Sequence, residues 1–209
     1  MALKDVVPAG GVEKQPFIPY VEARDYPPAL EPVLEPYMRR MGFLPNALKL
    51  YMHRPEIAET LWKLNSNIMR DPSSALDQNL KRRLAAVASK INGCTYCTAH
   101  HCSMLKRPRE LAAEGWGMSH EELTRLLKGN EEPKDEFERV CFDFVRAASA
   151  DPGNVPDEIL ERLKALLSPP QIIELACLAG FWKMYNTIHD ALKIPIESHL
   201  LEDAAYVAA

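Results

Sequence analysis

The stretch LKRRLAAVASKINGCTYCTAHH, residues 80–101, sets both the helical pattern and the candidate chemistry of this chain. Its apolar residues recur at four-three-four spacing, the period of one helix face, at Leu80, Leu84, Val87 and Ile91. The Asn92-Gly93 pair then breaks the helix, and a new helix is expected to start at the cysteines. The face opposite the apolar stripe carries small residues and Arg82, which suits close packing or a pocket wall.

The second half of this stretch combines a C-x-x-C pair with histidines. On a helix, Cys94, Cys97 and His101 share one face, and His100 lies on its flank. Cys94 would sit at a helix start, where unpaired backbone N–H groups favour a thiolate, and Cys97 would have His101 one turn on as a base. This arrangement indicates redox chemistry.

The expected reaction is attack of Cys97 on the O–O bond of a peroxide, after which Cys94 resolves the sulfenic acid as a disulfide. The order of roles stays open, because in many C-x-x-C helices the first cysteine is the more reactive one. A zinc site is the rival interpretation, with ligands drawn from Cys94, Cys97, His100, His101 and Cys102. A closed zinc site normally draws a second ligand pair from a distant segment, and no second C-x-x-C or H-x-x-x-H is present, so no metal is expected.

The remaining cysteines have the surroundings of packing residues. Cys102 lies about 80° around the helix from Cys94, and Cys141 and Cys177 have apolar neighbours typical of buried, inert thiols. A later helical stripe of amphipathic side chains consists of Trp182, Tyr185, Asn186 and His189. Core packing is its first interpretation, and the lining of a pocket beside the thiols is the alternative.

Outward from these segments, almost the whole chain predicts helices, and the alternation and turns of hairpins are missing. The fold class is therefore all-α, with an extended Pro- and Gly-rich arm over residues 1–27 and a single helical domain over residues 28–209. The other predicted helices are Pro28–Met41, Pro45–Met52, Pro55–Arg70, Glu110–Glu114, Ser119–Lys128, Glu136–Ala150, Pro156–Leu166 and Pro169–Leu192.

A weak internal echo appears when the chain is shifted by about 92 positions. Cys94 then falls on Asn186, Cys97 on His189 and His101 on Lys193. Both segments are long helical approaches to a polar cluster, so the echo raises the hypothesis of two related helical halves, of which one kept the thiols.

Composition narrows the function classes. The net charge is −4 and no dense basic block occurs, so nucleic-acid binding is not expected. The longest apolar run, residues 172–182, is too short to cross a membrane. The N-terminus shows no secretory signal, which predicts a cytoplasmic protein whose five cysteines are thiols, a redox pair or ligands.

These residues resemble the AhpD-like alkylhydroperoxidase branch of the carboxymuconolactone decarboxylase family. The specific part is Leu76-Asp77 and the stretch of residues 80–101, and the flanking signatures are Gly42-Phe-Leu-Pro-Asn46, His53-Arg-Pro-Glu56 and Pro170-Gln-Ile-Ile-Glu174 with Asn186 and Asp190-Ala-Leu192. The resemblance covers most of residues 28–195. It implies an AhpD-like helical bundle, a homo-oligomer (trimer or hexamer), a small hydroperoxide substrate, a dithiol protein or small thiol as reductant, and no cofactor. It also implies that Cys97 is peroxidatic, Cys94 resolving and His101 the relay base.

One position departs from the family. A glutamate commonly stands twelve residues before the first cysteine, and here that position is Arg82. Arginine cannot accept a proton. It could stabilise a thiolate, bind an anionic substrate, or simply be solvated or ion-paired. Glu174 occupies the equivalent position in the second half of the echo, and a two-fold-like packing of the halves could bring it near the thiols. The candidate relay or substrate-binding residues are therefore Arg82, His100, Glu174 and His189.

Two further functions remain as alternatives. Decarboxylation of a cyclic lactone acid would use imidazole and arginine groups, and full activity of a Cys97→Ser variant would support it. A non-catalytic metal-binding or redox-sensing helical module would carry stoichiometric zinc and lose helicity or assembly on chelation.

Overall fold

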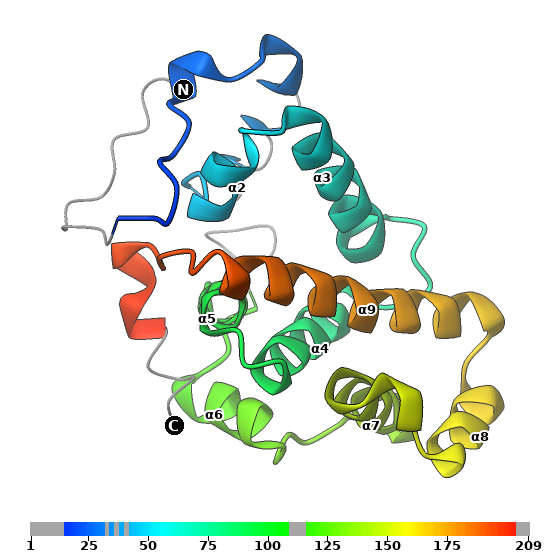
Figure 1. The fold of residues 1–209 in the computed structure, drawn as a ribbon. Coiled ribbons are helices and arrows are strands. Elements are labelled where there is room, and N and C mark those ends of the chain that lie inside the picture. The colour runs from blue at the N-terminus through cyan, green and yellow to red at the C-terminus, as the bar shows by residue number, and fades with distance from the viewer. Residues whose placement is uncertain (1–14, 32–33, 36–37, 40–41, 109–115, 204–209) are drawn as a thin grey trace.

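The computed structural model describes residues 15–31, 34–35, 38–39, 42–108 and 116–203 (Figure 1). Within these ranges all regular elements are helical and no strand occurs, which confirms the all-α class. The α-helices are α2 (Asn46–Tyr51), α3 (Pro55–Arg70), α4 (Gln78–Ile91), α5 (Thr95–Lys106), α6 (His120–Lys128), α7 (Glu136–Ala150), α8 (Asp157–Leu166) and α9 (Pro169–Ala191).

Some predicted elements lie outside the described residues. The predicted helix Glu110–Glu114 falls there entirely, as do the first 14 residues of the arm and parts of Pro28–Met41. The described end of the arm contacts α2, since Val21 N donates to the Lys49 carbonyl at 3.3 Å. The division into an arm and one domain stays a prediction.

Helix α4 lies at the centre of the bundle. Asp77 caps its first turn by accepting from Leu80 N at 3.1 Å, and Gly93 ends the segment in the left-handed region at φ +82°. Leu80, Leu84 and Val87 of the predicted apolar stripe are buried and Ile91 is partly buried, while on the opposite face Ala85 and Ala86 have no exposed surface. Small side chains let α5, α7 and α9 approach α4 closely on all sides.

Helix α9 brings a distant segment of the chain to the cysteines. It begins with a capping box between Ser168 and Gln171, and in Figure 1 its orange end passes over α4 and α5. Two hydrogen bonds fix its position: Asn92 Nδ2 donates to Asn186 Oδ1 at 2.8 Å, and Asn186 Nδ2 donates to Ser89 Oγ at 3.2 Å. The break between α4 and α5 therefore lies directly against α9.

The internal echo has a structural counterpart in one respect. Asn186 and His189, which the shift aligns with Cys94 and Cys97, lie beside that cysteine pair in space. Helix α9 runs through without a break, however, where the first segment is interrupted at Gly93. The origin of the two halves by duplication stays a prediction.

Across the described ranges, no helix combines the length and the hydropathy that a membrane span requires.

Candidate functional site

The two cysteines occupy the first turn of α5. Cys94 is the N-cap residue, and its Sγ accepts from Cys97 N at 3.4 Å. Gly93 makes this geometry possible, because its positive φ turns the chain sharply between α4 and α5. Both thiols are buried, with exposed fractions of 0% for Cys94 and 3% for Cys97.

The histidine that contacts Cys97 comes from α9. His189 Nδ1 lies 2.9 Å from Cys97 Sγ, within hydrogen-bond distance. The His189 ring stacks on Tyr51 at 5.8 Å between centroids and meets the edges of Tyr96 and Tyr185. The prediction that the α9 stripe packs as core holds only in part, since His189 is a partner of the thiol.

Burial keeps this pair neutral. It raises the pKa of the Cys97 thiol well above its ordinary value, Cys94 raises it further, and a hydrogen bond from Asn186 opposes them only partly. Burial also lowers the pKa of His189 to about 3. The resting pair is thus a Cys97 thiol hydrogen-bonded to an uncharged His189 imidazole.

His101 has a different neighbour. Its Nδ1 lies 3.3 Å from Nη1 of Arg82, and its ring meets Trp182 edge-on at 4.2 Å between centroids. Burial, and then the charge of Arg82, lower the pKa of His101 well below its ordinary value. Arg82 is only 3% exposed, so it is not a solvated surface residue. The structure therefore joins His101 to Arg82 and gives Cys97 its hydrogen bond to His189.

A buried acid lies beside His100 that the sequence analysis did not identify. Glu197 Oε2 lies 2.8 Å from His100 Nε2, and its Oε1 accepts from Tyr96 Oη at 3.0 Å and from Asn46 N at 2.6 Å. Burial alone would raise the pKa of Glu197, but His100 and the hydrogen bonds outweigh it and lower that pKa to about 2. The available signal was Glu197 as the one acidic residue of the segment 194–201, which is otherwise mostly apolar.

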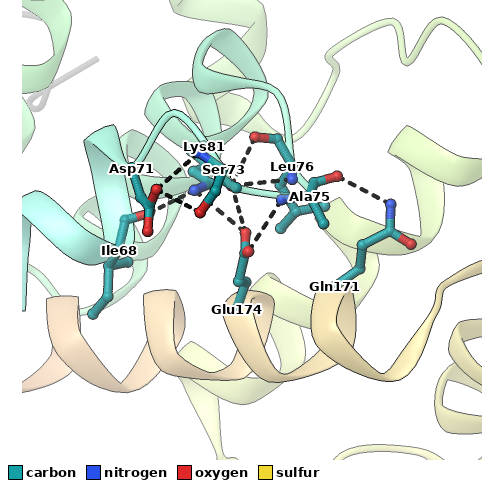
Figure 2. A network of polar contacts seen from close by, with 9 residues as sticks. Ile68, Asp71, Ser73, Ala75, Leu76, Lys81, Gln171 and Glu174 are labelled. Carbon is teal, nitrogen blue, oxygen red and sulfur yellow. Dashed lines mark hydrogen bonds and ion pairs between the residues drawn. The ribbon is translucent and has the colours of Figure 1, made fainter.

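Glu174, the acid proposed for the relay, makes its contacts elsewhere. It accepts from Ser74 Oγ at 2.6 Å and from Ala75 N at 3.1 Å, and it pairs with Lys81 Nζ at 3.4 Å (Figure 2). Fifteen residues separate it from His189 on the same helix, which is about 22 Å along the axis. The echo placed Glu174 correctly on α9 but at the wrong end for the thiols.

A cavity of about 70 Å³ adjoins Cys97. Its wall contains five aromatic side chains, Tyr51, Trp62, Tyr96, Trp182 and Tyr185, and two cations, Arg70 and Arg82. None of the described lining residues carries a carboxylate. Among the buried polar atoms of the wall that lack a hydrogen-bond partner within the described ranges are Tyr51 Oη, His101 Nε2, Trp182 Nε1 and His189 Nε2. Such atoms normally find partners, so they mark where a bound molecule would be recognised.

The same residues also form a group of potential metal ligands. The side-chain donor atoms of Cys94, Cys97 and His189 all lie within 4.8 Å of one another. His100, His101 and Cys102, which the spacing alone had offered as ligands, are not part of this group.

The other cysteines divide into two classes. Cys102 and Cys141 are buried, and burial raises the pKa of each to about 12, which fits the prediction of inert packing residues. The prediction of a buried Cys177 is wrong, because this residue is exposed. It lies on the outer face of α9, where apolar sequence neighbours do not imply burial.

Comparisons with known proteins agree with this fold. Residues 55–114 match the model of the carboxymuconolactone decarboxylase family. The crystal structure of a cysteine-to-alanine variant of the debrominase Bmp8, in complex with 2,3,4-tribromopyrrole, superposes on this chain with a TM-score of 0.73. The two sequences are 21% identical, and the match covers 96% of this chain and 100% of the Bmp8 chain.

Two uncharacterised peroxidase-related proteins are also similar. The AhpD core protein from Ralstonia eutropha JMP134 is 15% identical over 90% of this chain and 96% of its own, with a TM-score of 0.74. The protein from Silicibacter sp. TM1040 is 22% identical, with a match that covers 88% of this chain and 95% of its own and a TM-score of 0.72. No curated protein matches the chain. At these identities the structures establish an AhpD-like fold.

Proposed function

We propose that the chain is a thiol-dependent peroxidase cycling a Cys94/Cys97 disulfide, and the match of residues 55–114 to the carboxymuconolactone decarboxylase family and the AhpD-like fold support this proposal. The observation that carries this proposal is the 2.9 Å contact between Cys97 Sγ and His189 Nδ1 beside a second buried thiol. Cys97 is the peroxidatic residue, Cys94 resolves, and His189 takes the part of the base that the resemblance gave to His101.

The first step transfers two electrons from sulfur to the peroxide. Cys97 Sγ attacks the O–O bond and becomes a sulfenic acid, while the thiol proton passes by way of His189 to the leaving oxygen and an alcohol forms. Since both groups are neutral at rest, the proton moves as sulfur attacks and not before. Tyr51 and Trp182 have donors in the cavity wall that suit the two peroxide oxygens.

The second step closes the cycle on the protein. The Cys94 thiol displaces hydroxide from the sulfenic acid, so that the disulfide and one water form. A dithiol protein or small thiol then reduces the disulfide. Glu197 acts at a distance: its hydrogen bonds hold His100 and Tyr96, and the Tyr96 ring packs against His189. Arg82 and Arg70 favour substrates that carry a carboxylate.

The test is a thiol titration before and after one equivalent of tert-butyl hydroperoxide. We expect the loss of two thiols per chain and a Cys94–Cys97 disulfide in the peptide map. The Cys94→Ser variant should stop at a sulfenic acid on Cys97 that dimedone traps, and the Cys97→Ser variant should retain its remaining thiols. Retention of both thiols in the wild-type protein under excess hydroperoxide would refute the proposal.

The aromatic wall of the cavity favours reductive dehalogenation as a second candidate. Five aromatic side chains line the cavity beside the Cys97 thiol, which suits a small flat ring, and the structurally similar Bmp8 is a debrominase. The same dithiol would supply the electrons: an aryl bromide and two thiols give the arene, a disulfide, bromide and a proton. Release of bromide from 2,3,4-tribromopyrrole without oxidation by hydroperoxide would favour this candidate over the peroxidase.

A further inference from the structure

We propose that the reduced protein binds one thiophilic divalent cation, such as Zn²⁺, between Cys94, Cys97 and His189, and that this cation holds the dithiol out of the redox cycle. The binding site stands on the geometry of these three residues. Its regulatory consequence rests on the proposed thiol-dependent function.

The three donors are already gathered around one point. Their ligand atoms lie within 4.8 Å of one another, and zinc bonds of about 2.0 to 2.3 Å put two ligands of one ion roughly 3.3 to 3.8 Å apart. Small side-chain movements would suffice to enclose an ion. The elements that carry the donors are fixed, because Asn186, one turn before His189, bonds to Asn92 and Ser89 beside the cysteines.

The charge balance favours a divalent ion. The two thiolates cancel the charge of a divalent cation and the neutral imidazole adds none, so the complex is neutral overall. This matters because an unpaired charge in a buried site has a large unfavourable free energy. Sulfur and imidazole nitrogen are the ligands that zinc prefers over magnesium or calcium.

The site has the features of an exchangeable site and not of a permanent structural one. It has three protein ligands, and since Cys97 and His189 both line the cavity, a fourth position would open toward it. His189 Nε2 has no hydrogen-bond partner within the described ranges, whereas a ligating histidine is normally held by one on its other nitrogen. A missing partner of this kind lowers metal affinity by roughly 10- to 100-fold.

Binding and oxidation exclude each other. The metal complex has both sulfurs bonded to the cation, whereas the disulfide has no thiolate to offer. Oxidation of the complex by a hydroperoxide consumes two protons and gives a disulfide, an alcohol, water and the free cation. Zinc should therefore slow the reaction with peroxide, and the peroxide should release zinc.

The test uses Co²⁺ as a spectroscopic probe on the reduced, reductant-free protein under nitrogen. We expect one Co²⁺ per chain, with a thiolate-to-cobalt charge-transfer band and the visible bands of a tetrahedral ion, both removed by Zn²⁺. The Cys94→Ser and Cys97→Ser variants should lose the charge-transfer band or bind only weakly. His189→Ala should bind at least about tenfold more weakly. Cys102→Ser is the matched control and should bind as the wild-type protein does.

Several outcomes would overturn the proposal: no thiolate band at saturation, an unchanged band in the disulfide form, or unchanged binding by His189→Ala. The effect of Zn²⁺ on thiol oxidation tests the regulatory part separately. If the metal-free thiols react with hydroperoxide and Zn²⁺ does not slow them, that part is wrong. If Co²⁺ binds as described but the metal-free thiols do not react, the peroxidase proposal fails and the metal site stands.

Discussion

Helix α9 takes part in two polar clusters, and they differ in how completely their atoms are satisfied. Near the start of α9, Glu174 pairs with Lys81 of α4 and accepts hydrogen bonds from Ser74 and Ala75 (Figure 2). Lys81 Nζ also donates to the Ile68 carbonyl at 2.7 Å. Near the end of α9, Cys97 and His189 adjoin a cavity whose wall holds several buried polar atoms without partners in the described ranges, among them Tyr51 Oη and His189 Nε2. A satisfied network stabilises the fold, whereas unsatisfied buried atoms indicate a place for a ligand.

The largest expected effect comes from the reactive sulfur of the second cluster. Cys97→Ser should lower the rate of oxidation by hydroperoxide by about 10³-fold or more, because a hydroxyl is a far weaker nucleophile toward the O–O bond. Stopped-flow measurement of peroxide consumption gives the rate. Cys102→Ser is the control, since its buried thiol is expected to take no part, and a comparable loss there would show that the assay reports general damage.

Glu197 tests whether the buried carboxylate next to the thiols also supports the fold. Glu197→Gln should lower the free energy of unfolding by about 3 kcal/mol, because an amide cannot reproduce all the contacts that the carboxylate makes with His100 Nε2, Tyr96 Oη and Asn46 N. Chemical denaturation measures the loss. In the double variant with His100→Gln the two losses should not add, and strict additivity would contradict a direct pairing of these residues.

The pH dependence of stability tests the neutral histidines. An unfolded histidine gains its proton below about pH 6.5, while folded His189 keeps a pKa of about 3, so the unfolded state binds more protons as the pH falls. The free energy of unfolding should therefore fall by about 2 kcal/mol per such histidine between pH 6.5 and pH 5. Denaturation at both pH values should show a smaller fall for His189→Gln, and an identical fall would mean that His189 is charged in the folded protein.

The first cluster should give the smallest effect and no effect on chemistry. Glu174→Gln should lower the free energy of unfolding by about 1 kcal/mol, because the pair with Lys81 is partly open to solvent on the Glu174 side. Oxidation of the thiols should stay within about twofold of the wild-type rate. A large loss of that rate would return Glu174 to the relay.

The sequence predicted the local structure of this molecule well. The four-three-four apolar spacing and the Asn92-Gly93 break gave α4, the turn and the first turn of α5, because each depends on residues close together in the chain. The position of Cys94 as the helix cap followed from the same break. These features are local, so periodicity and a left-handed glycine are enough to predict them.

The partners across the bundle could not be predicted in this way. Placing His189 against Cys97 depends on the position of α9 relative to α5, and Glu197 reaches His100 from a segment 97 residues away. The internal echo aligned His189 with Cys97 in sequence, but two residues that align in this way need not be in contact in the folded protein. The spacing of four residues between Cys97 and His101 suggested a pair, whereas burial beside Arg82 gave His101 another neighbour.

The central claim is that His189, and not His101, serves the thiol of Cys97. The most direct measurement compares the second-order rate constants of thiol oxidation by hydroperoxide in His189→Gln and His101→Gln, with correct folding checked by circular dichroism. We expect His189→Gln to lose about 10²-fold or more and His101→Gln to lose less than about tenfold. A greater loss in His101→Gln than in His189→Gln would contradict the account.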